Sequence, residues 1–323
     1  MHFSSYKYSR ALRQFMIAVI ALAYWCALGG GAVGLAQTTY FSRQTGAWSA
    51  LASWSTVSHT GAAAASLPGA TDTVIVGDGH LLTLNQNAAV HEARIENGTL
   101  RYDNVAARQL TINGDLRIAA NGVLTVQTVG AGLANYLLLR GNVHCDGVWT
   151  MRPNPTSDNF RVTVVFLTPA LQTLRGAPVQ ASLYRVLFNK GSRDGVVDCA
   201  FSVSLGDNAG TLENMDFSTA LFGAIGGTWR QSAGTLSFGT AGQRIEVSGA
   251  VHITGEGCMM FGQNGAGATL TLDGGELLLN TANPAPSRIG ITPGNSLLYT
   301  GSVDRSSFVL QRGALEIAGR FSR

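Results

Sequence analysis

A nine-residue template, in which apolar residues alternate with polar ones around a central glycine, recurs along this 323-residue chain. The template occurs at residues 110–118 (LTINGDLRI), 137–145 (LLLRGNVHC) and 245–253 (IEVSGAVHI). Alternation with a period of two predicts a β-strand that buries one face. The central glycines fall in the buried phase, where a missing side chain lets two short strands meet at a bend. We therefore expect structural glycines at Gly114, Gly141 and Gly249.

The repeated template predicts an all-β protein built of coils of roughly 20–27 residues, a length typical of repeat architectures. A β-solenoid stacks such coils so that each buries its face against its neighbours, whereas a pair of antiparallel β-sandwiches is the alternative. Charged residues make up only 13% of the chain, against about 25% in ordinary soluble domains. This low charge favours the solenoid. We predict a solenoid over residues 75–323, capped by an N-terminal segment at 37–74.

Residues 1–36 have the pattern of a secretory signal peptide. Three basic residues (Lys7, Arg10 and Arg13) precede an uncharged apolar run, and small residues follow up to Ala36. We expect cleavage after Ala36 and a secreted or cell-surface protein with no remaining membrane span. Without the leader, 19 basic residues balance 19 acidic ones, so the mature chain has no basic surface for nucleic acid.

The order of several motifs resembles a known family. These motifs are GAWSALASWS, LPGATDTVIV, GHLLTL and IENGTL within residues 46–100, followed by FLTPALQTLRG at 166–176 and YRVLFNK at 184–190. They are similar to the G8-type, glycine-rich β-repeat region of secreted Bacteroidota surface proteins, which typically use type IX secretion. The resemblance implies a right-handed parallel β-helix in an adhesin-like protein. The C-terminal sorting domain usual in that group is not found here.

Four tryptophans are the candidates for contact with a ligand, because aromatic rings can stack on sugars. Trp48 and Trp54 are six residues apart and point the same way in an extended segment. For these two we favour packing over the first coil, as part of the N-terminal cap, over contact with a sugar. Trp149 and Trp229 lie singly. An extracellular glycan or a surface or matrix protein is the partner class that these residues fit.

Catalysis is not the favoured interpretation. Asp194 and Asp198, beside Arg193, are the best acidic cluster for glycoside hydrolysis, but Arg193–Gly195 reads first as a turn. Asp72 and His80 flank a short strand and are interpreted as turn residues rather than an acid–base pair. A polysaccharide hydrolase or lyase remains the alternative to a non-enzymatic structural protein.

No cofactor or metal site is expected. His144 and His252 hold equivalent template positions on the polar phase, where Arg117 stands in the first copy, so we interpret them as surface residues. Cys145, Cys199 and Cys258 are too few and too widely spaced for a disulfide scaffold or a zinc site. We expect them to be buried as small apolar side chains.

The final segment, residues 308–323, continues the alternation, with Leu315, Ile317 and Phe321 in the apolar phase. An uncovered last coil exposes unpaired strand edges. We therefore expect either that the chain is the N-terminal part of a longer surface protein, or that its C-terminal edge self-associates or is covered by a partner. The function that these features favour is a rod-like, adhesin-like surface protein, with a glycan-binding module or a polysaccharide-processing enzyme as alternatives.

Overall fold

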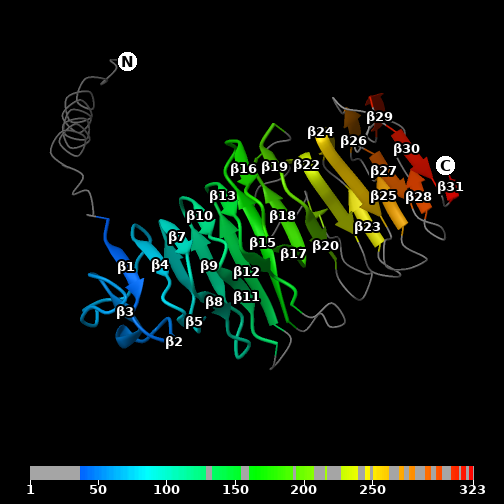
Figure 1. Cartoon of the computed structure of the whole chain (residues 1–323). Helices are drawn as coiled ribbons and strands as arrows, with labels where there is room; N and C mark the ends of the chain where they lie inside the picture. Colours follow the sequence, from blue (N-terminus) through cyan, green and yellow to red (C-terminus); the bar gives the residue numbers. More distant parts are fainter. Residues whose placement is uncertain are drawn as a thin grey trace, which may run out of the picture. The chain divides into compact units, whose positions relative to one another are not determined.

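The computed structural model (Figure 1) describes a large part of the compact unit formed by residues 37–323. Side chains are described only in the part before residue 237. The described residues are 37–128, 133–153, 160–191, 194–206, 215–216, 227–238, 244–247, 250–261, 269–272, 276–280, 288–291, 296–299, 307–312, 314–317 and 320–322. The predicted signal peptide and Gly249 lie outside the described residues.

The described part of the chain is all-β, and its strands stack in three parallel ladders, as Figure 1 shows. In the first ladder each strand pairs with the strand three places further along the chain. It contains β1 (Thr39–Ser42), β4 (Thr73–Val76), β7 (Glu92–Ile95), β10 (Leu116–Ile118), β13 (Val143–Cys145), β16 (Gln172–Arg175) and β19 (Val196–Cys199).

The second ladder follows the same rule of pairing. It contains β2 (Gly46–Ala47), β5 (Leu81–Leu84), β8 (Thr99–Tyr102), β11 (Val123–Val126), β14 (Val148–Thr150), β17 (Gln180–Leu183) and β20 (Val203–Leu205). Two long strands then join the ladders into one sheet, which continues through shorter strands. The two long strands are β22 (Thr228–Phe238) and β24 (Ala250–Phe261). The shorter strands are β26 (Glu276–Asn280), β27 (Arg288–Ile291), β29 (Ser307–Arg312) and β30 (Ala314–Ile317).

The third ladder is a separate sheet and is again parallel. It contains β6 (Ala88–Val90), β9 (Gln109–Ile112), β12 (Leu133–Leu139), β15 (Phe160–Leu167), β18 (Arg185–Asn189), β21 (Met215–Asp216), β23 (Arg244–Val247), β25 (Thr269–Leu272), β28 (Ser296–Tyr299) and β31 (Arg320–Ser322). Parallel pairing within all three ladders disagrees with the alternative of antiparallel sandwiches.

The N-terminal segment 37–74 does more than cover the first coil. It supplies β1 and β2, the first strands of two ladders, as well as a short 3-10 turn, η1 (Leu51–Ser53). The following β3 (Trp54–Ser55) pairs with β1, and this is the one antiparallel pair among the described strands. Because β3 occupies the free edge of β1, that edge of the first ladder is paired. The boundary proposed at residue 74 stays a prediction.

The sequence template matches the observed register in its first two copies. Leu110 of β9 stacks on Leu137 of β12, and Leu116 of β10 stacks on Val143 of β13. Inward residues of these strands form one apolar core, which explains the alternating burial of β5, β8 and β9. The predicted coil length is exceeded in places, since stacked Asn142 and Thr173 are 31 residues apart.

Glycine is required at the turns because successive coils approach closely there. A Cβ atom on Gly141 would lie 2.3 Å from the carbonyl oxygen of Gly114, and one on Gly114 would lie 2.9 Å from that of His91. Both glycines are half-buried between two strands rather than fully buried. The sequence therefore located the turns correctly. The bend was the reason predicted for glycine there, but the structure shows that a side chain is excluded because it would collide with the neighbouring coil.

Polar side chains at the same turns hold one coil to the next. Asp115 accepts a hydrogen bond from the Asn142 backbone N–H at 2.9 Å. Asn142 in turn accepts one from the backbone N–H of Thr173 at 2.9 Å. Backbone donors that the strands leave unpaired are thus satisfied by side-chain oxygens of the adjacent coil, as buried or half-buried turns require.

Candidate binding groove

Four cationic or ionisable side chains form a column along the outward face of the first ladder. Arg94 of β7 is in register with Arg117 of β10, which is in register with His144 of β13, and His144 with Arg175 of β16. Neighbouring strands in a sheet are about 4.8 Å apart, so the column repeats at that interval. The predicted surface position of His144 is confirmed, since its side chain is 52% exposed.

Glu92, two residues before Arg94 on β7, is the partner of two of these cations. Glu92 accepts two hydrogen bonds from Arg94, each at 3.0 Å, and a third from Arg117 at 3.1 Å. The pKa of Glu92 lies below its usual value, and the main cause is the hydrogen bond from Arg94; partial burial acts in the opposite direction. Arg117 nevertheless keeps a side chain that is 55% exposed. Its guanidinium therefore remains accessible to a ligand.

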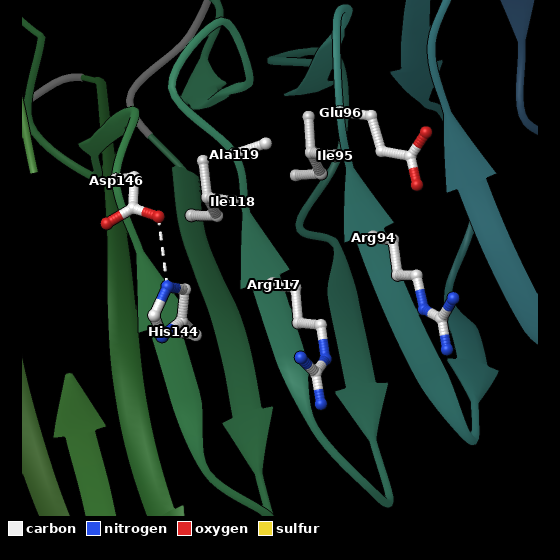
Figure 2. A pocket seen from close by; sticks show the side chains of 8 residues that line it. All are labelled: Arg94, Ile95, Glu96, Arg117, Ile118, Ala119, His144 and Asp146. Carbon is white, nitrogen blue, oxygen red and sulfur yellow. Dashed lines mark hydrogen bonds and ion pairs between the residues drawn. The ribbon is translucent and has the colours of Figure 1, made fainter. Parts of the chain in front are cut away.

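Two adjoining hollows run along this face, with volumes of about 380 and 170 Å³. Arg117 and His144 line both hollows and stand between them, and together the two hollows cross β7, β10, β13 and β16 as one grooved surface. Figure 2 shows the residues that line the larger hollow. We call this surface the charged groove. The remaining lining residues are Arg94, Ile95, Glu96, Asp115, Leu116, Ile118, Ala119, Asn142, Val143, Asp146, Thr173 and Arg175.

Within the charged groove, His144 and Asp146 form a pair that is visible in Figure 2. His144 Nε2 lies 2.9 Å from Asp146 Oδ2. The other oxygen of Asp146 accepts the backbone N–H of Ala177 at 2.9 Å. This backbone hydrogen bond is the main cause that lowers the pKa of Asp146, and the hydrogen bond with His144 adds to it. The carboxylate is thus charged and fixed, and it orients the imidazole toward the groove.

Asp198 of β19 joins three coils. It accepts a hydrogen bond from Arg230 Nε at 2.8 Å and is ion-paired with Arg175. Burial alone would raise the pKa of this carboxyl, but the hydrogen bonds from Arg230, Arg175 and Ser232 outweigh it and hold the pKa below its usual value. An ionised, clamped carboxylate cannot serve as a general acid, so Asp198 stabilises the stack. Its predicted neighbour Asp194 is exposed in the turn that precedes β19, and Arg193 lies outside the described residues.

The expectation that tryptophans contact a ligand is wrong. Trp48, Trp54, Trp149 and Trp229 are each 0% exposed. Trp48 and Trp54 pack edge-to-face with ring centroids 4.8 Å apart, and Trp54 donates its indole N–H to the Trp48 carbonyl at 2.8 Å. The rings are buried because they point inward and fill the core between the ladders. The packing role that the sequence favoured for Trp48 and Trp54 is the one observed.

Asp72 and His80 do not form an acid–base pair. Asp72 accepts backbone N–H groups of Gly69 and Thr38, at 2.8 and 3.1 Å, which is the predicted turn role. His80 Nδ1 lies 2.9 Å from the carbonyl oxygen of Ser42, and His59 Nδ1 lies 2.6 Å from the same oxygen. A carbonyl oxygen can only accept, so both rings donate from Nδ1. The two histidines thereby hold the N-terminal loop against the first coil.

The remaining predictions divide between confirmed and untested ones. Cys145 and Cys199 are buried, and burial raises the pKa of each thiol to about 12, so they behave as apolar side chains. The side chain of Cys258 lies outside the described residues. The backbone register places His252 in the column that contains Arg230 and Asp198, and not in the column of His144 as the template implied. The third copy of the template is therefore shifted along the strand direction relative to the first two copies.

Within the described ranges, no group of three or more His, Cys, Asp and Glu side chains is placed to hold a metal ion. No helix in this part of the chain is long and apolar enough to span a membrane. The absence of a cofactor stays a prediction. Sequence reasoning missed the charged groove, because its residues come from separate coils that only the register brings together.

Comparison with known proteins gives no relative. No protein-family model, no curated protein and no solved structure matches this chain.

Proposed function

We propose that this chain is an exported, non-enzymatic surface protein that attaches to an extracellular ligand through the charged groove. In this proposal the leader 1–36 is removed and the mature chain is secreted or held at the cell surface. The three ladders close into a right-handed parallel β-helix with residues 37–74 as its N-terminal cap. The motif order within residues 46–100, which resembles the G8-type region of adhesin-like proteins, agrees with this proposal.

One observation carries the proposal: the two hollows of the charged groove adjoin and follow the ladder across successive coils. Their lining presents both donors and acceptors, from Arg117, His144 and Asp146. A ligand with many hydroxyl groups needs both kinds of partner, and an extended ligand can use a site that repeats from coil to coil. A linear glycan meets both conditions, so we propose a glycan as the ligand.

The test is binding of the mature chain to an array of glycans and matrix proteins. We expect a glycan signal that Arg117→Ala and His144→Ala each reduce at least tenfold. Arg140→Ala is the matched control, because Arg140 is an exposed arginine of a neighbouring turn outside the groove. Equal binding by all variants would remove the groove from the proposal. Binding to matrix proteins alone would replace the glycan, and no binding at all would contradict attachment.

A polysaccharide-cleaving enzyme is a second candidate that one observation favours. His144, oriented by Asp146 and next to Arg117, has the arrangement of a general base beside a cation. Under this alternative the purified chain releases fragments from a polysaccharide, and His144→Ala abolishes their release. Binding without fragment release, over the same substrates, supports attachment instead.

A further inference from the structure

A buried lysine that does not line the charged groove lies at the turn that follows β18. The side chain of Lys190 is 1% exposed. Its Nζ atom donates a hydrogen bond to Gln172 Oε1 at 2.7 Å and another to the Ala170 carbonyl oxygen at 2.8 Å. Both acceptors are uncharged, so the amine has neutral partners in an environment that usually excludes an unpaired charge.

The side chain of Gln172 is held as firmly as that of Lys190. Gln172 is the first residue of β16 and is buried. Its Nε2 donates hydrogen bonds to the carbonyl oxygens of Leu139, at 3.1 Å, and Gly141, at 2.8 Å. With Oε1 accepting from Lys190, the whole carboxamide has a fixed orientation. Its carbonyl carbon lies one bond beyond the atom that Lys190 already touches.

Burial also places the amine in a reactive state. Loss of hydration lowers the pKa of Lys190 to about 8, from an ordinary value of 10.5. A large share of this side chain is therefore a neutral amine at mildly alkaline pH, and a desolvated neutral lysine is a nucleophile. The fold already holds the two reacting groups in contact, so their reaction does not have to overcome the entropy loss of bringing them together.

We propose that Lys190 and Gln172 are the site of an intramolecular isopeptide cross-link. The neutral amine of Lys190 attacks the carboxamide carbon of Gln172 and forms a new C–N bond. The bond from that carbon to Nε2 breaks, and the proton lost by the attacking nitrogen leaves with Nε2 as ammonia. One amine and one amide thus give one secondary amide and ammonia, and no other reactant is consumed.

Two features of the site favour the product. The reaction converts a buried amine, whose protonated form is poorly solvated there, into a neutral amide. The cross-link would also join β16 to the turn after β18, closing the chain around the segment between Gln172 and Lys190. A covalent tie of this kind restricts the unfolded chain, as a disulfide does. The inference does not depend on glycan binding by the charged groove.

The experiment is intact-mass analysis of the folded mature chain, followed by peptide mapping, during incubation at about pH 9, above the pKa of about 8. We expect a progressive mass loss of one ammonia and a branched peptide that joins Lys190 to Gln172. Lys190→Met and Gln172→Leu should each abolish both signals. Because the wild-type chain itself gives the primary signal, poor folding of a variant leaves the test intact.

Gln231 provides an internal control. It is also fully buried, and its Nε2 donates to backbone carbonyls, but its Oε1 accepts from the indole N–H of Trp229 instead of an amine. It should keep its ammonia under the same conditions. An unchanged mass after prolonged incubation of folded protein would overturn the proposal. Loss of ammonia that maps to Gln231 or to other residues would overturn it equally.

Discussion

The outward faces of the first and third ladders differ sharply, although the same coils form both. On β7, β10 and β13 the outward side chains are charged or ionisable and are partly or fully exposed. On β12, β15 and β18 the outward side chains form a second apolar cluster, containing Leu138, Val165, Leu167 and Leu187, with Tyr136 packed against it. Strands buried on both faces carry continuous apolar runs, whereas half-exposed strands alternate. One coil therefore contains both doubly buried and half-exposed strands, and only the half-exposed strands present a face that a ligand can reach.

The largest expected effect compares a new charge on the two faces. Val165 is 0% exposed, so Val165→Asp should lower the free energy of unfolding by about 4 kcal/mol, because the carboxylate would be buried without a partner. Arg117→Asp, on the face of the first ladder, should lower the free energy of unfolding by about 1 kcal/mol, mainly because the ion pair with Glu92 is lost. Urea unfolding of both variants measures this. Similar losses would mean that the two faces are not different environments.

A second comparison concerns the turn shared by the two ladders. Gly141→Val should cost about 3 kcal/mol, because the added side chain meets the Gly114 backbone. Asn142→Val, one residue further and exposed, should cost less than about 1.5 kcal/mol, the value of its hydrogen bonds. Thermal unfolding distinguishes them. Equal effects would remove the close approach of the coils as the reason for glycine.

These two comparisons indicate how far the sequence was informative. Alternation around Gly114 and Gly141 correctly predicted strands, turns and stacking, because these depend on local periodicity. The doubly buried third ladder has a signal in the unbroken apolar run Leu137–Leu139, which the template treated as ordinary alternation. The displacement of the third template copy could not be predicted, since register is set by contacts between distant coils.

The candidate sites were harder to predict for the same reason. The tryptophans were available as residue types, but their direction depends on which strand face is enclosed. The template already placed Arg117 and His144 at equivalent outward positions, but Arg94 and Arg175 lie outside its copies and join the column only through the ladder. Lys190 is a lysine at the end of an apolar strand, and nothing local shows that the neighbouring coil covers it.

A third prediction tests the clamp that closes the charged face at β19. Asp198→Asn should lower the free energy of unfolding at pH 7 by about 2 kcal/mol, because charged hydrogen bonds to Arg175 and Arg230 are weakened. Since folding depresses the pKa of Asp198, its contribution is present well above pH 3.8 and is lost as the pH falls below that value. Unfolding curves over pH 7 to about 3 should therefore converge for wild type and variant. Parallel curves would count against the clamp.

The smallest expected effect lies in the exposed ion pairs of the same face. Glu92→Gln should lower the free energy of unfolding by about 0.5 kcal/mol at low salt and by less at high salt, because salt screens its pairs with Arg94 and Arg117, whose guanidinium groups are about half-exposed. Val165→Ala serves as the contrast, because an apolar cavity should lower the free energy of unfolding by the same amount at both salt concentrations. Denaturant titrations at two salt concentrations check this. A salt-independent loss at Glu92 would show that the pairs are more enclosed than their exposure indicates.

In-register parallel stacking of the coils is tested most directly by disulfide formation between paired positions. Arg117 and His144 are register partners on adjacent strands, so Arg117→Cys with His144→Cys should oxidise readily, because in-register partners have Cα atoms within the range of about 4.4–6.8 Å that a disulfide needs. Arg117→Cys with Asp146→Cys, displaced by two residues along the strand, should not. Buried Cys145 and Cys199, whose thiol pKa values are about 12, should stay reduced. Efficient cross-linking of the displaced pair, or of neither pair, would contradict the parallel ladder.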